Sequence, residues 1–263
     1  MKKKFLLIIV LLCTLSCSQK NRNSEKQHDK IVDYYENGSL RSEFKINSFS
    51  EKDGLAKIYY PNGQLKEEGL WVRNKQEGIW NYYYEDGSKM STASWKDDKQ
   101  TGYSVQYYPN GKIKEKGNYV NGLPNGIQEI FFEDGVLNKK MEFKEGVQNG
   151  LYESFYPNKQ LEQRGTYVNG KKDGKFLTYY DNGNLEQEGY FKNGVENGFF
   201  KTYYANGKER EIGNWKEGKQ IGFWQYFYEN GNLEQEGNFK NGSFSGEWNL
   251  YDKNGKITKK NFH

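Results

Sequence analysis

Residues 222–245 read GFWQYFYENGNLEQEGNFKNGSFS, and this stretch decides the fold because its pattern returns along almost the whole chain. Its turn pair, Asn230-Gly231, recurs as Asn-Gly or Asp-Gly at a step of 24 residues, with Lys159 at the one slot in the series that lacks glycine. Such self-similarity is typical of repeat proteins. The turn glycines are Gly63, Gly87, Gly111, Gly135, Gly183, Gly207, Gly231 and Gly255; second glycines with the same step are Gly54, Gly78, Gly102, Gly126, Gly150, Gly174, Gly198, Gly222 and Gly246.

Each unit predicts a β-hairpin. Residues 223–228 are rich in aromatic side chains, and residues 233–240 alternate apolar and polar side chains. The Asn-Gly pair between them favours a type I′ turn, which needs positive φ at both central residues. A further turn at Asn241-Gly242 leads into the next unit, and no segment of the array has the 3.6-residue period of a helix. We therefore predict an all-β fold, an elongated single-layer antiparallel β-meander of about nine 24-residue hairpin repeats.

Counting from the turn glycine predicts what each face of the sheet holds, because side chains alternate along a strand. Leucine two residues after it, glycine six after it and an aromatic residue eight after it all fall on one face. For a two-residue turn, Tyr228 pairs with Leu233 and Trp224 lies opposite Gly237. The missing Cβ of Gly237 then leaves room for the indole, which gives a physical reason for a glycine inside a strand.

A row of aromatic residues lies four positions before each turn glycine and, by parity, on the opposite face. Its neighbours on the adjoining strand are Lys, Gln, Glu and Asn, so a ring row among polar groups is a candidate partner-binding surface. The alternative is that these rings only cover the second face of the sheet. The row consists of Tyr59, Tyr83, Tyr107, Phe131, Phe155, Tyr179, Tyr203 and Phe227.

The N-terminal segment predicts export. Residues 1–16 combine three lysines with a short apolar run, as in a cleaved signal peptide. Thr14-Leu15-Ser16-Cys17 resembles a bacterial lipobox, which makes Cys17 the expected lipidation site and the cell envelope the expected location, as a membrane-anchored lipoprotein; ordinary secretion is the alternative. Residues 17–30 are polar and predict a disordered tether. The repeat array is expected over residues 31–263.

Several classes of function are disfavoured by composition. The only histidines are His28 and His263, and the only cysteines are Cys13 and Cys17, so no catalytic triad, thiol nucleophile or metal site is expected. Glu68, Glu188 and Glu236 repeat at one slot, as on a solvated strand face. A formal net charge of +4 with Lys and Glu interspersed argues against nucleic-acid binding. We expect no enzymatic activity and no cofactor.

Residues 179–194, YYDNGNLEQEGYFKNG, carry a family resemblance. The aromatic pair, Asn-Gly, Leu, Glu-Gly, aromatic and Asn-Gly series resembles the MORN repeat, and more closely its bacterial variant, over about residues 31–263. Proteins with this variant include those named as YwqK-type antitoxins and many exported bacterial lipoproteins, and eukaryotic MORN proteins act as scaffolds. The motif is structural, so the resemblance assigns no functional residue.

Three functions are compatible with these observations. The first is a non-enzymatic, lipid-anchored protein-binding module or scaffold, of which an antitoxin-like or immunity-like protein is one instance. The second is a cell-wall glycan-binding or choline-binding module built from aromatic hairpins, although choline-binding units are shorter than the 24-residue step here. The third is a structural spacer.

Overall fold

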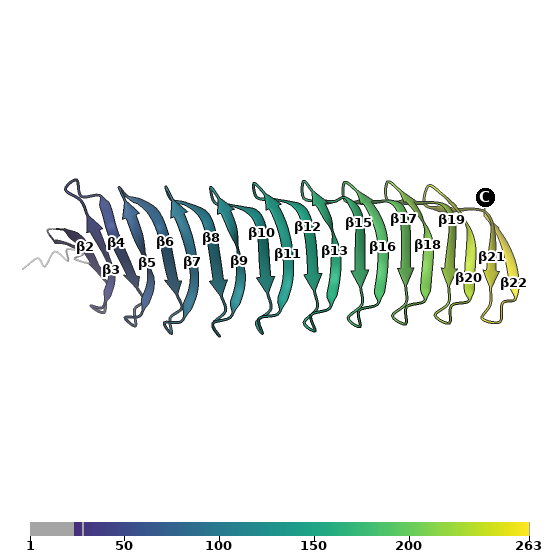
Figure 1. Cartoon of the computed structure of the whole chain (residues 1–263), viewed down its shortest axis with the longest axis horizontal. Coiled ribbons are helices and arrows are strands. Elements are labelled where there is room, and N and C mark those ends of the chain that lie inside the picture. Colours follow the sequence, from purple (N-terminus) through teal and green to yellow (C-terminus); the bar gives the residue numbers. More distant parts are fainter. Residues whose placement is uncertain (1–23, 28, 263) are drawn as a thin grey trace, which may run out of the picture.

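The computed structural model describes residues 24–27 and 29–262, and its regular structure there is entirely β (Figure 1). The strands form one 22-stranded sheet. Each strand pairs antiparallel with the next along the chain, and β13 pairs with both β14 and β15, which are two pieces of one interrupted strand. At about 4.8 Å per strand the sheet is about 100 Å long. The predicted single-layer, elongated meander is confirmed.

The strand bounds follow the 24-residue step. They are β1 Ser24–Gln27, β2 Lys30–Tyr34, β3 Leu40–Ile46, β4 Lys52–Tyr59, β5 Leu65–Val72, β6 Lys75–Tyr83, β7 Lys89–Lys96, β8 Lys99–Tyr107, β9 Ile113–Val120, β10 Leu123–Phe131, β11 Leu137–Lys144, β12 Val147–Phe155, β13 Leu161–Val168, β14 Lys171–Lys172, β15 Gly174–Tyr179, β16 Leu185–Lys192, β17 Val195–Tyr203, β18 Glu209–Lys216, β19 Lys219–Phe227, β20 Leu233–Lys240, β21 Ser243–Tyr251 and β22 Ile257–Phe262.

The N-terminal boundary of the sheet differs from expectation. Cys17 and the predicted signal peptide lie outside the described residues, as does most of the predicted tether. Within that tether, however, β1 pairs with β2 through residues 24–27, so the sheet already includes this stretch. Backbone pairing of this kind needs no apolar side chain, which is why composition alone does not reveal it.

The turn at Asn230-Gly231 is not the predicted type I′ turn. The Gly231 amide donates to the Tyr228 carbonyl at 2.8 Å, and the Tyr228 amide donates to the Asn232 carbonyl at 2.8 Å. Gly231 has a φ of +92°, whereas Asn230 does not have positive φ. This is a three-residue loop, a type I turn followed by a left-handed glycine.

The longer loop changes the register beside it. Phe227, rather than the predicted Tyr228, pairs with Leu233, and a bulge between Tyr226 and Phe227 then restores the predicted pairing of Trp224 with Gly237. Cross-strand partners share a face, so the leucine row lies on the face of Phe227. The prediction that it shares a face with the glycine row is therefore wrong. An even count of residues does not preserve the face across a bulge.

Type I′ turns occur instead at the other end of the strands. Asn241 and Gly242 have φ values of +52° and +85°. Asp97 and Asp98 adopt the same conformation without any glycine, at +49° and +63°. Asparagine and aspartate tolerate positive φ better than other non-glycine residues.

The second glycine of each unit lies in a β-bulge. Gly222 has a φ of +66°, and every member of its series has positive φ. The register moves from Asn214 paired with Ile221 to Ile212 paired with Gln225, so Gly213 alone faces residues 222–224. The additional residues bend β19 and bring Trp224 back toward β18.

This bend changes which glycine each ring covers. A Cβ added to Gly213 would stand 2.1 Å from Cδ2 of Trp224, and one added to Gly237 would stand 2.3 Å from Cδ2 of Trp248. The ring therefore covers the glycine of the preceding strand, and the prediction that Trp224 covers Gly237 is wrong. The contact joins successive units instead of the two strands of one hairpin.

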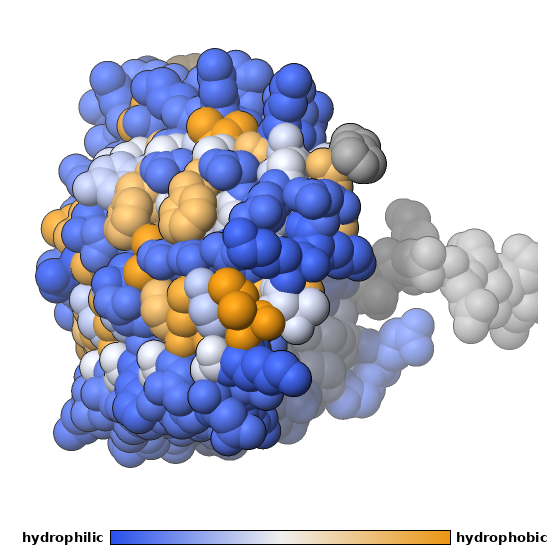
Figure 2. Space-filling model, turned by 90° about the vertical axis from the view of Figure 1, so that its right-hand side faces the viewer, coloured by the Kyte–Doolittle hydropathy of each residue, from blue (hydrophilic) through white to orange (hydrophobic). Residues whose placement is uncertain are grey.

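The two faces of the sheet are unequal. On one, the core face, the indoles of Trp80, Trp224 and Trp248 are 0% exposed. Trp224 packs edge-to-face against Trp215 at 5.7 Å and against Phe239 at 5.9 Å, both on the same face. The other face, which carries Phe227, we call the open face. Seen from the C-terminal end, apolar side chains lie at mid-height between hydrophilic upper and lower margins (Figure 2).

Candidate functional site

The predicted ring row lies where parity placed it, on the open face. Each of its eight residues is the last residue of a strand that leads into an Asn-Gly-type turn, and all eight side chains are half-buried. The hydroxyl of Tyr83 donates to Glu68 at 3.0 Å. Burial and the adjacent Glu68 carboxylate raise the pKa of Tyr83.

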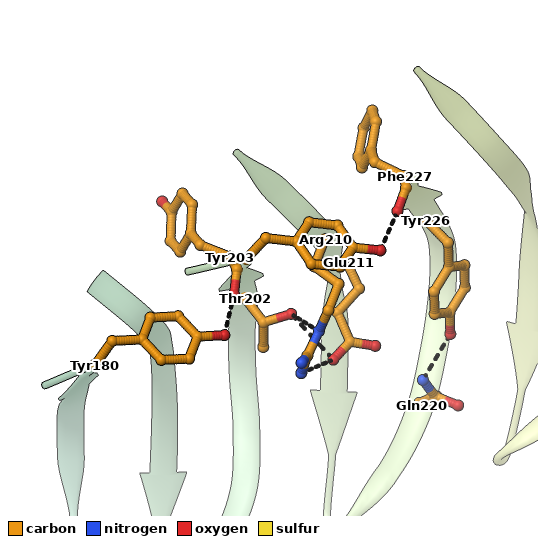
Figure 3. A network of polar contacts seen from close by, with 9 residues as sticks. Tyr180, Thr202, Tyr203, Arg210, Glu211, Gln220, Tyr226 and Phe227 are labelled. Carbon is orange, nitrogen blue, oxygen red and sulfur yellow. Dashed lines mark hydrogen bonds and ion pairs between the residues drawn. The ribbon is translucent and has the colours of Figure 1, made fainter. Parts of the chain in front are cut away.

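A second set of tyrosines holds the backbone of this row in place. The hydroxyl of Tyr180 donates to the Tyr203 carbonyl at 2.8 Å, and that of Tyr204 donates to the Phe227 carbonyl at 2.7 Å (Figure 3). The same bond recurs from Tyr35, Tyr60, Tyr84, Tyr108, Tyr156 and Tyr228, each to the next unit. Each such bond joins the turn region of one unit to the end of a strand in the next. Phe132 occupies the equivalent slot without a hydroxyl, so Phe155 is the one row member in the series that accepts no such bond.

Charged residues fill the middle of the open face. Lys116 pairs with Glu129 at 2.8 Å, Arg164 with Glu153 at 2.6 Å and Lys175 with Glu188 at 2.9 Å, all between neighbouring strands. The Nζ of Lys116 also lies 5.2 Å from the centre of the Phe131 ring. Cross-strand pairing of Glu188 agrees with a solvated strand face rather than a pair of catalytic acids.

Glu236 is held by neutral partners instead of a cation. Its carboxylate accepts hydrogen bonds from Gln225, Asn249 and Tyr251 at 3.0–3.2 Å. Burial opposes ionisation here, but the three hydrogen bonds together lower the pKa of Glu236. The carboxyl is therefore charged near neutrality and is committed to holding strands β19–β21 together.

Sequence reasoning missed a second set of exposed side chains on the same face. Directly after seven of the nine bulge glycines, an apolar residue points outward beyond the charged residues; Lys175 and Glu247 follow the other two. Ile79 is 63% exposed, Tyr103 52% and Phe223 50%. We call this set the apolar row: Leu55, Ile79, Tyr103, Ile127, Leu151, Phe199 and Phe223. The same 24-residue step could have revealed it, but the bulge that exposes it is not visible in an alternating pattern.

Among residues 24–27 and 29–262, no group of three or more His, Cys, Asp or Glu side chains could hold a metal ion. Within the same residues, no helix is long and apolar enough to cross a membrane. What the geometry offers is a long face with two parallel rows of rings and aliphatic side chains, separated by ion pairs.

Comparison with known proteins supports the repeat architecture. A family model described as "MORN repeat variant" matches residues 52–72, 76–97, 100–121, 124–145, 148–169, 172–193 and 222–241. No curated protein matches the chain.

Solved structures give only distant similarity. Alternansucrase in complex with isomaltononaose is 18% identical with a TM-score of 0.20, covering 80% of this chain and 18% of that one. A structure titled TcdB2-TccC3-TEV is 11% identical with a TM-score of 0.21, covering 89% of this chain and 16% of that one. The chain thus spans less than a fifth of these proteins, and similarity at this level says nothing about its function.

Proposed function

The chain belongs to the MORN repeat variant family, and from this premise we propose that it is a non-enzymatic repeat protein that binds another protein along its open face. The observation that carries the proposal is the apolar row. Its side chains are 38–63% exposed and follow seven of the nine bulge glycines, beside the ring row. Extended exposed apolar surface rimmed by polar residues marks interaction sites in soluble proteins.

The arrangement favours a large, shallow interface. Successive units place equivalent side chains about 10 Å apart, which suits a partner that lies along the ribbon. Rings such as Tyr103 and Phe223 can act as anchors, while the ion pairs between the rows orient the partner. A backbone fixed by the tyrosine bonds between units loses little freedom on binding.

Site-specific crosslinking tests this proposal. With p-benzoylphenylalanine in place of Phe223, irradiation of intact cells should give a discrete protein adduct, and the same residue in place of Asn206 at the turn edge should not. Purified partner should then bind the triple variant Ile79→Ser, Tyr103→Ser, Ile127→Ser at least tenfold more weakly. Equal adducts from both positions, or unchanged affinity of the triple variant, would contradict the proposal.

The finer parts of the proposal concern the anchor and the partner. We propose that residues 1–16 are a signal peptide, that Cys17 carries a lipid and that the protein is held in the bacterial cell envelope. Metabolic labelling with a fatty-acid analogue should mark the wild-type chain and leave Cys17→Ser unmarked. An antitoxin-like or immunity-like role predicts that a neighbouring gene encodes a toxic protein that co-expression of this chain neutralises.

A further inference from the structure

The core face contains a hollow lined by aromatic and polar side chains. It has a volume of 520 Å³ and lies near the turn edge between β11 and β16. Its walls include the rings of Phe132, Tyr152 and Tyr156. Pockets for small ligands have volumes of about 300–1,000 Å³ and combine ring surface with a few polar groups.

Small residues five positions before the turn glycine contribute to the hollow. In two units this slot holds a tyrosine: Tyr82 stacks on Trp80 at 6.3 Å, and Tyr226 stacks on Trp224 at 5.9 Å. Ser154 and Thr178 occupy the same slot beside the hollow. The space that a phenol ring fills beside Trp80 and Trp224 is therefore not filled by a ring here.

A second contribution is a side chain where most units have glycine. Met141 stands at the position equivalent to Gly213 and pairs across the strands with Tyr152. A methionine side chain occupies the space over which the next ring would lie. Tyr152 is consequently only half-buried and contributes ring surface to the hollow, whereas the equivalent Phe176 and Trp224 are buried at 1% and 0% exposure.

The floor of the hollow has unused hydrogen-bonding capacity. Ser154 is 2% exposed and lines the hollow. Gln163 donates to the hydroxyl oxygen of Thr178 at 3.3 Å, which leaves the hydroxyl proton of Thr178 available.

The charges around the hollow are also uncommitted. Lys139, Glu162 and Glu186 line it, and none of them forms an ion pair with another residue of the described chain. An ammonium on the rim disfavours a cationic ligand, and two carboxylates disfavour an anionic one. The site therefore suits a neutral ligand with one apolar surface and several hydroxyl groups.

We propose that this hollow binds a single pyranose ring of a neutral carbohydrate. The C–H face of the sugar would lie against the rings of Tyr152 and Phe132, and its hydroxyls would bond with Ser154, Gln163 and Thr178. Lys139 and Glu162 would contact the hydroxyls nearer the rim. The site lies on the core face, so it is independent of the proposed protein-binding open face.

Saturation-transfer NMR with maltose, cellobiose and N,N′-diacetylchitobiose tests the proposal on the full chain. At least one of these sugars should receive saturation, with a dissociation constant in the millimolar range. Ser154→Tyr inserts the ring that Tyr82 and Tyr226 already provide in their own units, so it should fill the hollow and weaken binding at least tenfold. Gln106→Tyr places the same ring in the same row outside the hollow and should leave binding unchanged.

Gln163→Ala provides a second route if Ser154→Tyr does not fold, as judged by circular dichroism. It removes a polar group from the floor without adding volume and should weaken binding of the same sugar severalfold. Lack of saturation transfer to all three sugars would overturn the proposal, as would unchanged binding by a folded Ser154→Tyr variant. Binding of choline with no binding of these sugars would overturn it equally.

Discussion

At the scale of single residues, the sheet depends on a fit between a missing Cβ and the ring that covers it. At Ala93, which replaces the glycine in one unit, the facing side chain is Ser104 and not a ring. Over Gly117 the ring is replaced by Gln128, whose amide donates to the Asn118 carbonyl at 2.7 Å. Trp224 makes the equivalent bond to Asn214 at 3.3 Å, so the amide keeps the polar contact of the indole without its surface.

Gly213→Ala should therefore destabilise the protein strongly. The added Cβ would stand 2.1 Å from Trp224, and neither the indole nor the strand can move without losing buried contacts. We expect a loss of about 1–3 kcal/mol in the free energy of unfolding, measured by urea denaturation. In a Trp224→Ala background the same substitution should cost much less, because the clash is gone. Equal costs in the two backgrounds would refute the proposed contact.

Phe132→Tyr should stabilise the protein. It would supply the one missing hydroxyl in the series of tyrosine-to-carbonyl bonds and reach the carbonyl of Phe155, as Tyr204 reaches that of Phe227 at 2.7 Å. A hydrogen bond of this kind contributes about 0.5–1.5 kcal/mol. Tyr204→Phe is the matched opposite change and should lower the unfolding midpoint. A lower midpoint for Phe132→Tyr would contradict the assignment.

Stability should fall above pH 10. Burial raises the pKa of Tyr82 and of Tyr226 to about 12, above the ordinary value of 10.0. Between these values the unfolded chain releases protons that the folded chain keeps, so alkali favours unfolding. Urea midpoints measured from about pH 9 to pH 12 should decrease, and less steeply for the double variant Tyr82→Phe, Tyr226→Phe. Identical slopes would show that other groups cause the loss.

At the scale of the hairpin, the sequence predicts the elements well and their connections less well. The 24-residue step predicts every hairpin from β4 onward, because turn glycine and alternating strands recur together. The turn type at Asn230-Gly231 does not follow, since Asn-Gly fits both a type I′ turn and a type I turn with a following left-handed glycine. The ring that covers Gly213 does not follow either, because the bulge at Gly222 interrupts the alternation on which face assignment rests.

The candidate site, too, is only partly predictable from the sequence. The face of the ring row follows from the alternation along residues 223–227, since the extra residue of the bulge beside Tyr226 and Phe227 is Glu234, on the neighbouring strand. The apolar row recurs at the 24-residue step, but its exposure does not follow from the sequence because it depends on a backbone bend. The hollow does not follow either, because it depends on the local combination of Met141, Ser154 and their neighbours.

Lys159→Gly should stabilise the hairpin formed by β12 and β13. Lys159 has a φ of +72° at a slot that elsewhere holds glycine, and its amide makes the usual bond to Tyr156 at 2.9 Å. Glycine adopts this left-handed conformation without strain, so the substitution should raise the free energy of unfolding by about 1 kcal/mol. Gly207→Lys is the opposite change at an uncrowded turn glycine and should destabilise by a similar amount. Thermal unfolding of both variants checks the pair, and a destabilised Lys159→Gly would contradict the turn assignment.

At the scale of the whole molecule, the packing of buried aromatic side chains is uneven along the sheet. Toward the C-terminus, Phe200, Trp224, Phe239 and Trp248 form one buried cluster. In the middle, Ser104 and Gln128 replace rings, so β8 and β10 contribute little buried aromatic surface. Each unit touches only its neighbours, so a weak middle is not compensated from elsewhere.

Hydrogen exchange should reveal this difference. Amides of β8 and β10 should exchange faster than those of β19 and β21 under native conditions, because local opening there exposes less apolar surface. Mass spectrometry of peptides from the four strands measures it. Uniform protection would mean that the sheet opens as a single cooperative unit. It would contradict the proposed difference in stability between β8 and β10 on the one hand and β19 and β21 on the other.

The tyrosine bonds all run the same way, each from one unit to its successor, and the rings that cover glycines all reach back to the unit before. Most joins between units thus repeat one geometry. A duplication or loss of 24 residues in the gene would lengthen or shorten the molecule by one increment of about 10 Å and leave every remaining joint intact. The number of repeat units, and with it the length of the sheet, can therefore change in evolution without loss of the contacts that stabilise the remaining units.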